Sequence, residues 1–525
     1  MKRTTWRTAR VVVFSAFSVI LLVACAKNPV TGKNDFLLVS EDWELQVGAQ
    51  QYLPLRQQQG GDYVVDPKVE DYVRSVGMKL AAHSDRKLPY EFNVINDSTP
   101  NAWALPGGKI SINRGLLVEL KSEAELAAVL GHEIVHAAAK HGAQGQTRGI
   151  GLQLGVMTAS VLGGRNGYGQ EVQMLSTIGA QIINSQYGQG AELESDRYGI
   201  EYMAAAGYDP QGAVELQKTF VKLSQGRGEN PLSRLFASHP PSAKRVQENM
   251  KTAARLKPGG ITGADRYRQS LARLFNTEEA YVAFDKAKAA LKQGKAQQAS
   301  TLVRQALKLE PREAHFHTLA GDISLAQKNL GAAKKSYDSA IRLNDAYYYS
   351  YLQRAKINEA QRNTRAAQAD YARSLRLLPT STAQLALGQF AERAGKTRVA
   401  QQYYARAAQA RGSDADKARQ GLMRLQPAAK GNTPGISEPV NARLLVRQGL
   451  SRDGEFIIQL INQTSRPISG IELSMQTAPG TPQQVQSVSG VIRPGKQWTH
   501  RTGRKFTAQQ AQRTRVVVSR AEVGG

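Results

Sequence analysis

An HExxH pattern runs from His132 to His136. Because residues four apart lie on the same face of a helix, these two histidines can share one metal ion. Glu133 lies beside them and can take a proton from the water molecule that attacks a peptide bond. The pattern predicts a zinc-dependent hydrolase; the alternative is two core or solvated histidines on an amphipathic helix.

Catalytic zinc usually has three protein ligands, and HExxH supplies only two. Further along, Glu192 and Asp196 are four residues apart and share one face of a predicted helix. Glu192 can complete a His₂Glu site, and Asp196 can accept the free ring N–H of a ligand histidine. Glu194, between them, is expected to be solvated. A polar helix face is the alternative, and the preceding HExxH pattern favours a metal site.

The elements that must position these residues lie between residues 66 and 141. A segment with helical spacing is followed by two alternating segments, 90–95 and 109–113, that predict strands on either side of a Pro-Gly-Gly turn. Ser122, with Glu125 three residues later, predicts a capping box at the start of the HExxH helix.

Two segments flank this region. Residues 26–60 are expected to be a mostly extended lead-in. Residues 142–190 are rich in Gly, Gln and Ser and predict a flexible, partly helical flap. The flap has no uninterrupted apolar run of about 18 residues, so no membrane span is predicted there.

The N-terminus predicts export. Residues 1–10 contain four basic side chains and no acid, and residues 11–24 form an apolar run of 14 residues, which is typical of a signal peptide. The run ends in Leu-Val-Ala before Cys25, the one cysteine of the chain, and this resembles a bacterial lipobox. A plain signal peptide with an incidental cysteine is the alternative. Ala26 stands where an aspartate usually signals inner-membrane retention, so we expect the outer membrane, facing the periplasm.

The net charge is +26, but its distribution argues against nucleic acid as the partner. Residues 25–260 carry 24 basic and 24 acidic side chains, whereas 261–425 carry 28 and 14. The excess therefore lies outside the region with the HExxH pattern, in a protein expected to be exported. A basic surface there can face anionic lipid, lipopolysaccharide or acidic proteins, or it can simply be solvated.

Small residues recur with a period near 34 at three helix positions. They are Ala299, Ala333, Ala367 and Ala400; Ala306, Ala340, Ser374 and Ala407; and Ala287, Gly321, Ala355 and Gly388. Small side chains at such positions let paired helices pack closely and stack on the next pair. The pattern resembles the tetratricopeptide repeat and predicts four helix pairs between about 277 and 412, whereas a non-repeating bundle would not share a period.

A Gly/Pro/Ala-rich linker, 427–439, precedes a region of short alternating segments separated by turn residues. These segments are 455–461, 468–475, 484–492 and 514–519. They predict a small antiparallel β-sandwich without catalytic residues.

Taken in order, four segments of the chain resemble the HtpX/BepA/Oma class of zinc metallopeptidases, which are gluzincins related to the CAAX prenyl endopeptidases. They are 101–108 (NAWALPGG), 110–112 (ISI), 125–136 (ELAAVLGHEIVH) and 192–196 (ELESD). The resemblance covers about residues 66–255. With the repeats it points to the periplasmic BepA-like subgroup, from which the C-terminal β domain departs.

The resemblance implies a role for each site residue. His132, His136 and Glu192 would bind one zinc ion per chain, and Glu133 would be the general base. Asp196 would support a ligand histidine.

Two further pairs of residues match the family. Asn101 and Ala102 would lie on an edge strand that pairs with the substrate backbone. His239, in a Ser-His-Pro sequence, and Arg245 would sit over the metal and stabilise the oxyanion. In BepA-like members the histidine can instead ligate zinc and close the site. We expect this gating role for His239, with Arg245 left to meet the oxyanion.

The remaining histidines have no comparable context. His141 is five residues past His136, off the ligand face, and is expected to be structural. The others are expected to be surface or core residues: His83, His315, His317 and His500.

The predicted protein is multidomain and mainly α-helical. Its expected parts are a signal peptide (1–24), a lipidated lead-in (25–60), an α+β zincin-like domain (61–255), a repeat α-solenoid (277–425) and a β-sandwich (441–525). The expected function is a zinc endopeptidase, lipid-anchored to the outer membrane, that cleaves misfolded or misassembled envelope proteins. The repeats would hold substrate or the outer-membrane assembly machinery. The alternative is a chaperone-like scaffold with a largely closed zinc site.

Overall fold

The computed structural model describes residues 25–148, 187–224, 233–425 and 444–523, the last range with short gaps. The gaps are 452, 463–465, 478–483, 489, 508–509 and 512–513. The predicted signal peptide, most of the predicted flap and the linker lie outside the described residues. The chain divides into two units, residues 1–426 and 427–525.

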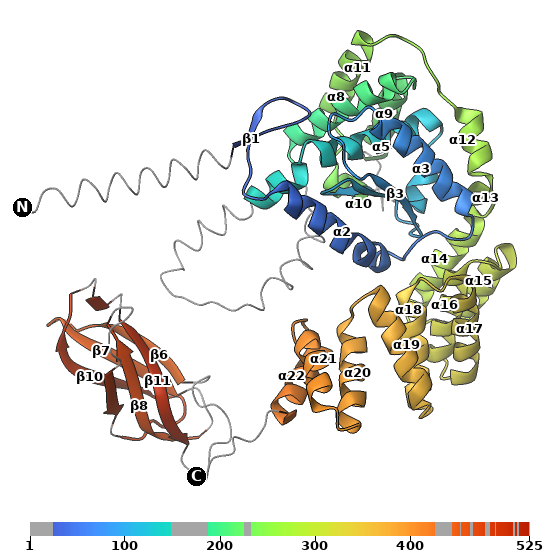
Figure 1. The fold of residues 1–525 in the computed structure, drawn as a ribbon. Coiled ribbons are helices and arrows are strands. Elements are labelled where there is room, and N and C mark those ends of the chain that lie inside the picture. The colour runs from blue at the N-terminus through green and yellow to red at the C-terminus, as the bar shows by residue number, and fades with distance from the viewer. Residues whose placement is uncertain are drawn as a thin grey trace, which may run out of the picture. The chain divides into compact units, whose positions relative to one another are not determined.

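The segment before the zincin-like domain is not the extended lead-in that the sequence predicted. A short hairpin of β1 (Cys25–Lys27) and β2 (Asn34–Phe36) is followed by α2 (Glu41–Gln58), a helix of 18 residues that Ser40 caps (Figure 1). The buried side chains of α2 include polar ones such as Glu44, which pairs with Arg86 at 2.8 Å. A helix that buries charged groups has no clear apolar stripe, which is why its sequence does not reveal it.

A three-stranded sheet follows α3 (Pro67–Ala81). Its strands are β3 (Glu91–Ile95), β4 (Ala102–Leu105) and β5 (Lys109–Asn113), in the order β3-β5-β4. β3 pairs with β5 in parallel, and β4 pairs with β5 antiparallel. The strands predicted at 90–95 and 109–113 are thus present, and β4 lies at an edge of the sheet.

Helices complete this domain. They are α4 (Arg114–Leu117), α5 (Glu123–Ala138), α8 (Gln189–Ala205), α9 (Gln211–Ser224), α10 (Ser233–Ser238) and α11 (Ala243–Arg255). Ser122 caps α5 by accepting the backbone N–H of Glu125 at 3.2 Å. The carboxylate of Glu125 turns back to the N–H of Lys121 rather than to that of Ser122, so only half of the predicted capping box forms.

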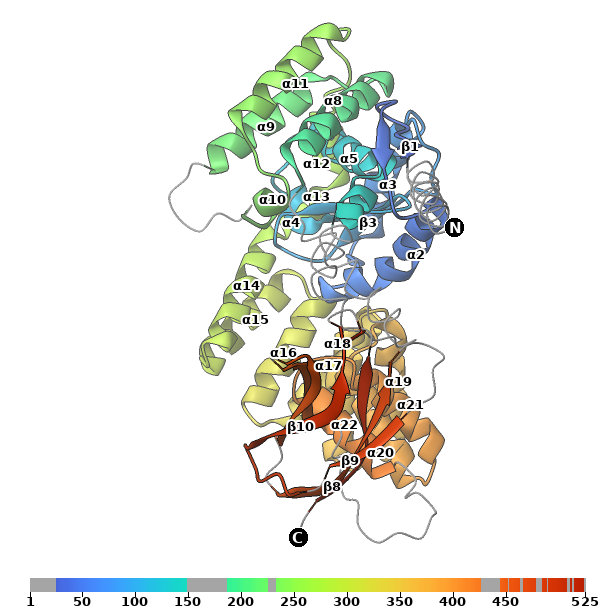
Figure 2. The ribbon, with the colours of Figure 1, turned by 90° about the vertical axis from the view of Figure 1, so that its left-hand side faces the viewer.

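The residues beyond 277 form paired helices, as the period predicted (Figure 2). The pairs are α14 (Glu278–Lys292) and α15 (Ala296–Leu309), α16 (Ala314–Ala326) and α17 (Leu330–Leu343), α18 (Tyr348–Ala360) and α19 (Thr364–Leu377), and α20 (Ser381–Arg393) and α21 (Thr397–Ala407), followed by α22 (Ser413–Leu425). Gly321 shows why the position needs a small residue, because a Cβ there would lie 2.6 Å from the Tyr337 ring.

Between the domain and the repeats lie the short helices α12 (Ala264–Ser270) and α13 (Ala272–Asn276). The repeats also contact the domain directly. The amide of Asn96 donates to the carboxylate of Glu313 at 3.0 Å, and the guanidinium of Arg114 lies 3.5 Å from the Tyr281 ring centroid. Both contacts are buried, so the first repeats are firmly placed against the sheet.

The second unit contains two three-stranded antiparallel sheets, β10-β7-β6 and β11-β8-β9. The strands are β6 (Leu444–Leu450), β7 (Glu455–Asn462), β8 (Ile468–Gln476), β9 (Gln484–Val488), β10 (Gln497–Lys505) and β11 (Arg515–Val523). The sequence did not predict strands β6 and β10. β10 alternates only weakly, because most of its side chains are exposed or partly exposed.

Among the described residues, no helix combines the length and the apolar character that crossing a membrane requires.

Candidate active site

Helix α5 carries the HExxH residues into the interior of the domain. His132, Glu133 and His136 are all buried, with at most 8% of each residue exposed. α5 packs against α8 where two glycines meet: a Cβ on Gly199 would lie 2.9 Å from the backbone nitrogen of His132. This close approach brings the acidic side chains of α8 within reach of the histidines.

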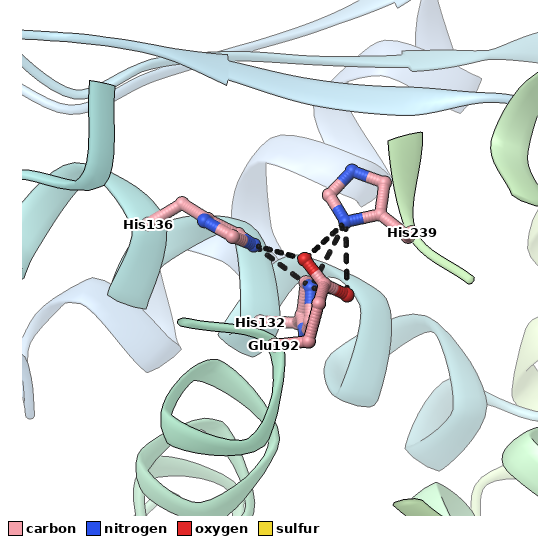
Figure 3. Close-up of side chains that lie close together, drawn as sticks. All are labelled: His132, His136, Glu192 and His239. Carbon is pink, nitrogen blue, oxygen red and sulfur yellow. Dashed lines mark hydrogen bonds and ion pairs between the residues drawn. The ribbon is translucent and has the colours of Figure 1, made fainter. Parts of the chain in front are cut away.

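Four side chains offer their donor atoms to one point: His132, His136, Glu192 and His239 (Figure 3). The Nε2 atoms of His132 and His136 are 3.0 Å apart, and a carboxylate oxygen of Glu192 lies 3.5 Å from the first and another 3.3 Å from the second. Ligands about 2.0–2.1 Å from a tetrahedral zinc are about 3.3 Å from each other. The spacing and the N/O donor set therefore fit a zinc ion.

Asp196, one turn after Glu192 on α8, sets the orientation of His132. Its Oδ1 lies 2.9 Å from Nδ1 of His132, so that nitrogen carries the proton and Nε2 keeps a lone pair for the metal. The carboxylate therefore fixes both the tautomer and the ring.

His239 follows the short helix α10 and completes the cluster. Its Nδ1 lies 3.2 Å from Nε2 of His132 and 3.1 Å from Oε1 of Glu192, and its Nε2 lies 3.6 Å from Oε1 of Glu133. The imidazole thus stands both at a fourth donor position and in front of the predicted base.

Glu133 is placed for proton transfer. Its Oε2 is buried and has no hydrogen-bond partner among the described residues. Burial raises the pKa of Glu133 above its usual value, although His239 and His132 oppose the shift. A carboxylate with a raised pKa is a stronger proton acceptor when it is ionised.

Arg245, on α11, binds the acidic side chains of α8. Its guanidinium donates to both oxygens of Asp196, at 2.6 and 2.7 Å, and its Nη1 lies 2.9 Å from Oε2 of Glu192. Both ends of the guanidinium are thus engaged by carboxylates, and the role of Arg245 at the oxyanion stays a prediction. Arg245 positions Glu192 and Asp196.

Acidic side chains gather around the histidines of the site. Three buried carboxyl groups, those of Glu133, Glu192 and Asp196, face one guanidinium, that of Arg245. Burial alone would raise the pKa of Glu192, but His239 and His132 hold it well below its usual range. An ionised buried cluster of this kind draws positive charge, which a divalent cation supplies.

Two side chains near the cluster, those of Glu194 and Tyr187, differ from what the sequence predicted. Nδ1 of His141 lies 3.0 Å from Nδ1 of His136, and its Nε2 lies 3.3 Å from Oε1 of Glu194. Glu194 therefore pairs with His141, and the prediction that it is solvated was wrong. Tyr187 stacks on His136 with ring centroids 4.0 Å apart. No spacing rule points to Tyr187, since it precedes α8 in a Gly/Gln-rich stretch.

The edge strand β4 packs against α5, the helix that carries the HExxH residues. Ala102 is the first residue of β4 and pairs with Ile112 of β5, and Asn101 directly precedes it. Oδ1 of Asn101 is buried and has no partner among the described residues. Among the described residues β4 has one neighbour in the sheet, and the pairing of its other side with a substrate strand stays a prediction.

Comparisons with known proteins agree with this geometry. Residues 67–253 match the model of peptidase family M48, and residues 284–348 match that of the tetratricopeptide repeat. Over 191 residues the chain is 34% identical to the mitochondrial metalloendopeptidase OMA1 of Arabidopsis thaliana, covering 34% of this chain and 36% of that protein. Over 319 residues it is 25% identical to the beta-barrel assembly-enhancing protease of Escherichia coli (strain K12), covering 53% and 65%.

The chain therefore spans less than two thirds of the length of both relatives. Among solved structures, the first TPR of Spaghetti (RPAP3) bound to an HSP90 peptide is 23% identical, covering 23% of this chain and 95% of that one, with a TM-score of 0.22.

Proposed function

We propose that this chain, whose residues 67–253 are a peptidase family M48 domain, is a zinc metalloendopeptidase. The observation that carries the proposal is the buried convergence of His132, His136 and Glu192 beside a carboxylate, that of Glu133, with an unpaired oxygen. A zinc ion bound there would polarise the scissile carbonyl and acidify the attacking water.

The chain's own residues supply the remaining steps. Glu133 takes the proton of the attacking water and returns it to the leaving amine. Asp196 keeps His132 in the tautomer that can bind metal, and Arg245 balances the charge of Glu192 and Asp196. The free side of β4, from Ala102, aligns the substrate backbone.

His239 closes the site in the resting state. As a fourth donor it occupies the position that the attacking water needs, and its Nε2 also faces Glu133. Activation requires the imidazole to swing away, which frees the donor position and the base together. A free, open protease in the periplasm would cut indiscriminately, so a gate of this kind has a purpose.

The same observation favours a second candidate function. With four protein donors the zinc site is complete, as in structural sites. A scaffold or chaperone-like lipoprotein would need no more than this closed state, with the repeats doing the binding. The intact Glu133 favours the peptidase.

The location and substrates form a further part of the proposal. We place the protein in the bacterial periplasm, anchored to the outer membrane through lipid on Cys25, where it cleaves misfolded or misassembled envelope proteins. The name of the Escherichia coli relative, which refers to β-barrel assembly, supports this setting. The repeats would hold the substrate or the outer-membrane assembly machinery.

The C-terminal sheets would pack face to face as a β-sandwich. Support comes from one apolar cluster that contains Phe456 and Leu460 of β7 together with Leu473 of β8 and Val518 of β11. No catalytic role is assigned to this unit.

Replacing the base tests the peptidase. Glu133→Gln should keep the metal and lower the cleavage rate of an unfolded protein about 10²–10⁴-fold, because the attacking water loses its proton acceptor. The matched control is Glu201→Gln, a change at a partly exposed residue of α8 that should leave the rate unchanged. Wild-type rates in metal-loaded Glu133→Gln protein would leave the scaffold as the better assignment.

Crosslinking the inactive Glu133→Gln protein in cells would then identify what it retains.

Removing the predicted lipid site tests the anchor. Cys25→Ser should release the protein from the membrane fraction, since the acyl chains provide the stable attachment. Unchanged fractionation would show that another part of the chain holds the membrane.

A further inference from the structure

A cavity of about 710 Å³ lies between the peptidase domain and the first three repeats. One wall is the end of α2 and the loop that precedes β4, and the other is formed by α14, α16 and the start of α18. A volume of 300–1,000 Å³ is typical of ligand sites.

The cavity is built into the fold, because buried contacts hold its two walls together. Glu313 of the repeats accepts the amide of Asn96 and the hydroxyl of Tyr281, the latter at 2.6 Å. The amide of Gln57, on α2, donates to the carbonyl of Ala346 and accepts the N–H of Tyr348. The cavity is therefore preformed.

One acidic side chain in the wall lacks a cation. Oδ1 of Asp322 accepts the hydroxyl of Tyr337 at 2.6 Å, that of Tyr349 at 3.4 Å and the amide of Gln353 at 3.3 Å. Within the described part of the chain, no lysine or arginine forms an ion pair with Asp322. Burial raises the pKa of this carboxyl, although these three hydrogen bonds oppose the shift.

A histidine in the same wall has an unused nitrogen. His315 is 7% exposed, and its Nε2 is buried without a hydrogen-bond partner among the described residues. Burial lowers the pKa of His315, which keeps the ring neutral and able to accept an N–H. A buried polar atom without a hydrogen bond lowers the stability of the fold. A ligand that donates a hydrogen bond to it therefore gains binding free energy.

Aromatic rings complete the lining. Tyr347 packs on His315 with ring centroids 4.6 Å apart, and Phe284, Tyr348 and Tyr349 also face the cavity. Aromatic faces attract ammonium and guanidinium groups. Lys288 lines the cavity as well, but its side chain is 57% exposed and its Nζ lies 4.0 Å from Asp285.

Two residues that line the cavity are each followed in the chain by a residue of the proposed active site. Asn101 and Ser238 line the cavity, and the next residues in the chain are Ala102, which begins the edge strand, and His239, the proposed gate. An extended peptide in the cavity can therefore continue along β4.

We propose that this cavity binds an unfolded polypeptide segment through one lysine or arginine side chain, held by Asp322, His315 and the tyrosine rings. The amide side chains of Gln58 and Asn101, in the facing wall, would meet its backbone. Binding in the cavity does not depend on the proposed peptidase function, whereas delivery of the segment to β4 rests on it. Residues 261–425 carry 28 basic and 14 acidic side chains, so an acidic aromatic cavity there selects basic segments against the background charge.

The test measures binding without cleavage, in full-length Glu133→Gln protein. The probes are two fluorescein-labelled, unstructured Gly/Ser peptides that differ only in a central arginine or glutamine, titrated by fluorescence anisotropy. We expect the arginine peptide to bind about tenfold more tightly. Asp322→Asn should remove most of that preference, because it deletes the charge and keeps an acceptor for the three hydrogen bonds.

The matched control is Asp345→Asn, which removes the same charge from an exposed site on the same array and should keep the preference. Equal binding of the two peptides by the unaltered cavity, or a preference that survives Asp322→Asn, would overturn the proposal. So would an equal loss in both variants, which indicates general charge attraction. A photo-crosslinker in place of Tyr348 should capture the arginine peptide, and failure to capture it would place binding elsewhere.

None of these outcomes depends on peptide cleavage. If Glu133→Gln cleaved like wild type, the peptidase assignment would fail while the cavity result stood.

Discussion

The metal-binding cluster and the cavity beside the repeats are both lined by buried polar side chains, but those side chains differ in where they find partners. In the cluster, His132, His136, Glu192 and His239 face one another, and Asp196 and Arg245 support them from behind. In the cavity, within the described part of the chain, Asp322 forms no ion pair and Nε2 of His315 has no hydrogen-bond partner.

The two regions therefore differ in what each needs before it can function. The cluster brings together four donors of the chain, and under the proposed function it must open by movement of one residue, His239, before it can act. The cavity is open. Polar atoms of its lining lack partners within the described part of the chain, and a bound ligand can supply them. A protein that combines the two can hold a substrate before it exposes its catalytic base, because binding and opening involve different residues.

The largest effect should come from breaking the cluster at its carboxylate ligand. Glu192→Ala removes the carboxylate donor and leaves the three histidines of the cluster, so zinc content after gel filtration should fall well below one per chain. Metal analysis after gel filtration measures this, with Glu201→Ala on the same helix as the control. Full zinc retention in Glu192→Ala would show that another residue is the third ligand.

A smaller loss should follow from the support behind the cluster. Asp196→Asn keeps an oxygen near His132 but loses the charge that holds Arg245, and zinc affinity should fall about 10–100-fold. Competition with a chelator gives the affinity. An unchanged value would mean that the histidine orientation depends on α5 alone.

The rigidity of the cluster depends on the contact of α5 with α8. Gly199→Ala places a Cβ 2.9 Å from the His132 nitrogen and should lower the free energy of unfolding by about 1–3 kcal/mol. Gly190→Ala, on the same helix with no atom within 4 Å, should instead raise it by up to about 1 kcal/mol. Urea titration of the metal-free protein compares the two. Equal effects would rule out helix contact as the cause.

The smallest expected change tests whether the cluster opens. His239→Ala should raise the basal cleavage of a loosely folded protein about tenfold, because the closed state no longer competes. His317→Ala, which changes a partly exposed histidine of the repeats, serves as control. A mutant slower by about 10²–10³ would show instead that His239 stabilises the oxyanion.

Local chemistry in the sequence was enough for several features. The HExxH spacing predicted the face of α5, and Ser122 predicted where that helix begins, because both depend on residues within one or two turns. The 34-residue period predicted the helix pairs, since a small residue lets the two helices of a pair pack closely, as Gly321 does against Tyr337. The sequence did not predict helix α2, because part of its buried face is polar. It did not predict strand β10, because most of that strand is exposed.

The sequence by itself determined which residue types could bind zinc and which helices would carry them. Only the tertiary structure decided that Arg245 faces carboxylates, that Glu194 pairs with His141 and that His315 lines a cavity. These outcomes depend on contacts between residues that are tens to hundreds of positions apart, and no periodicity records such contacts. Whether a polar side chain finds a hydrogen-bond or ion-pair partner within the chain depends on how the fold brings distant segments together.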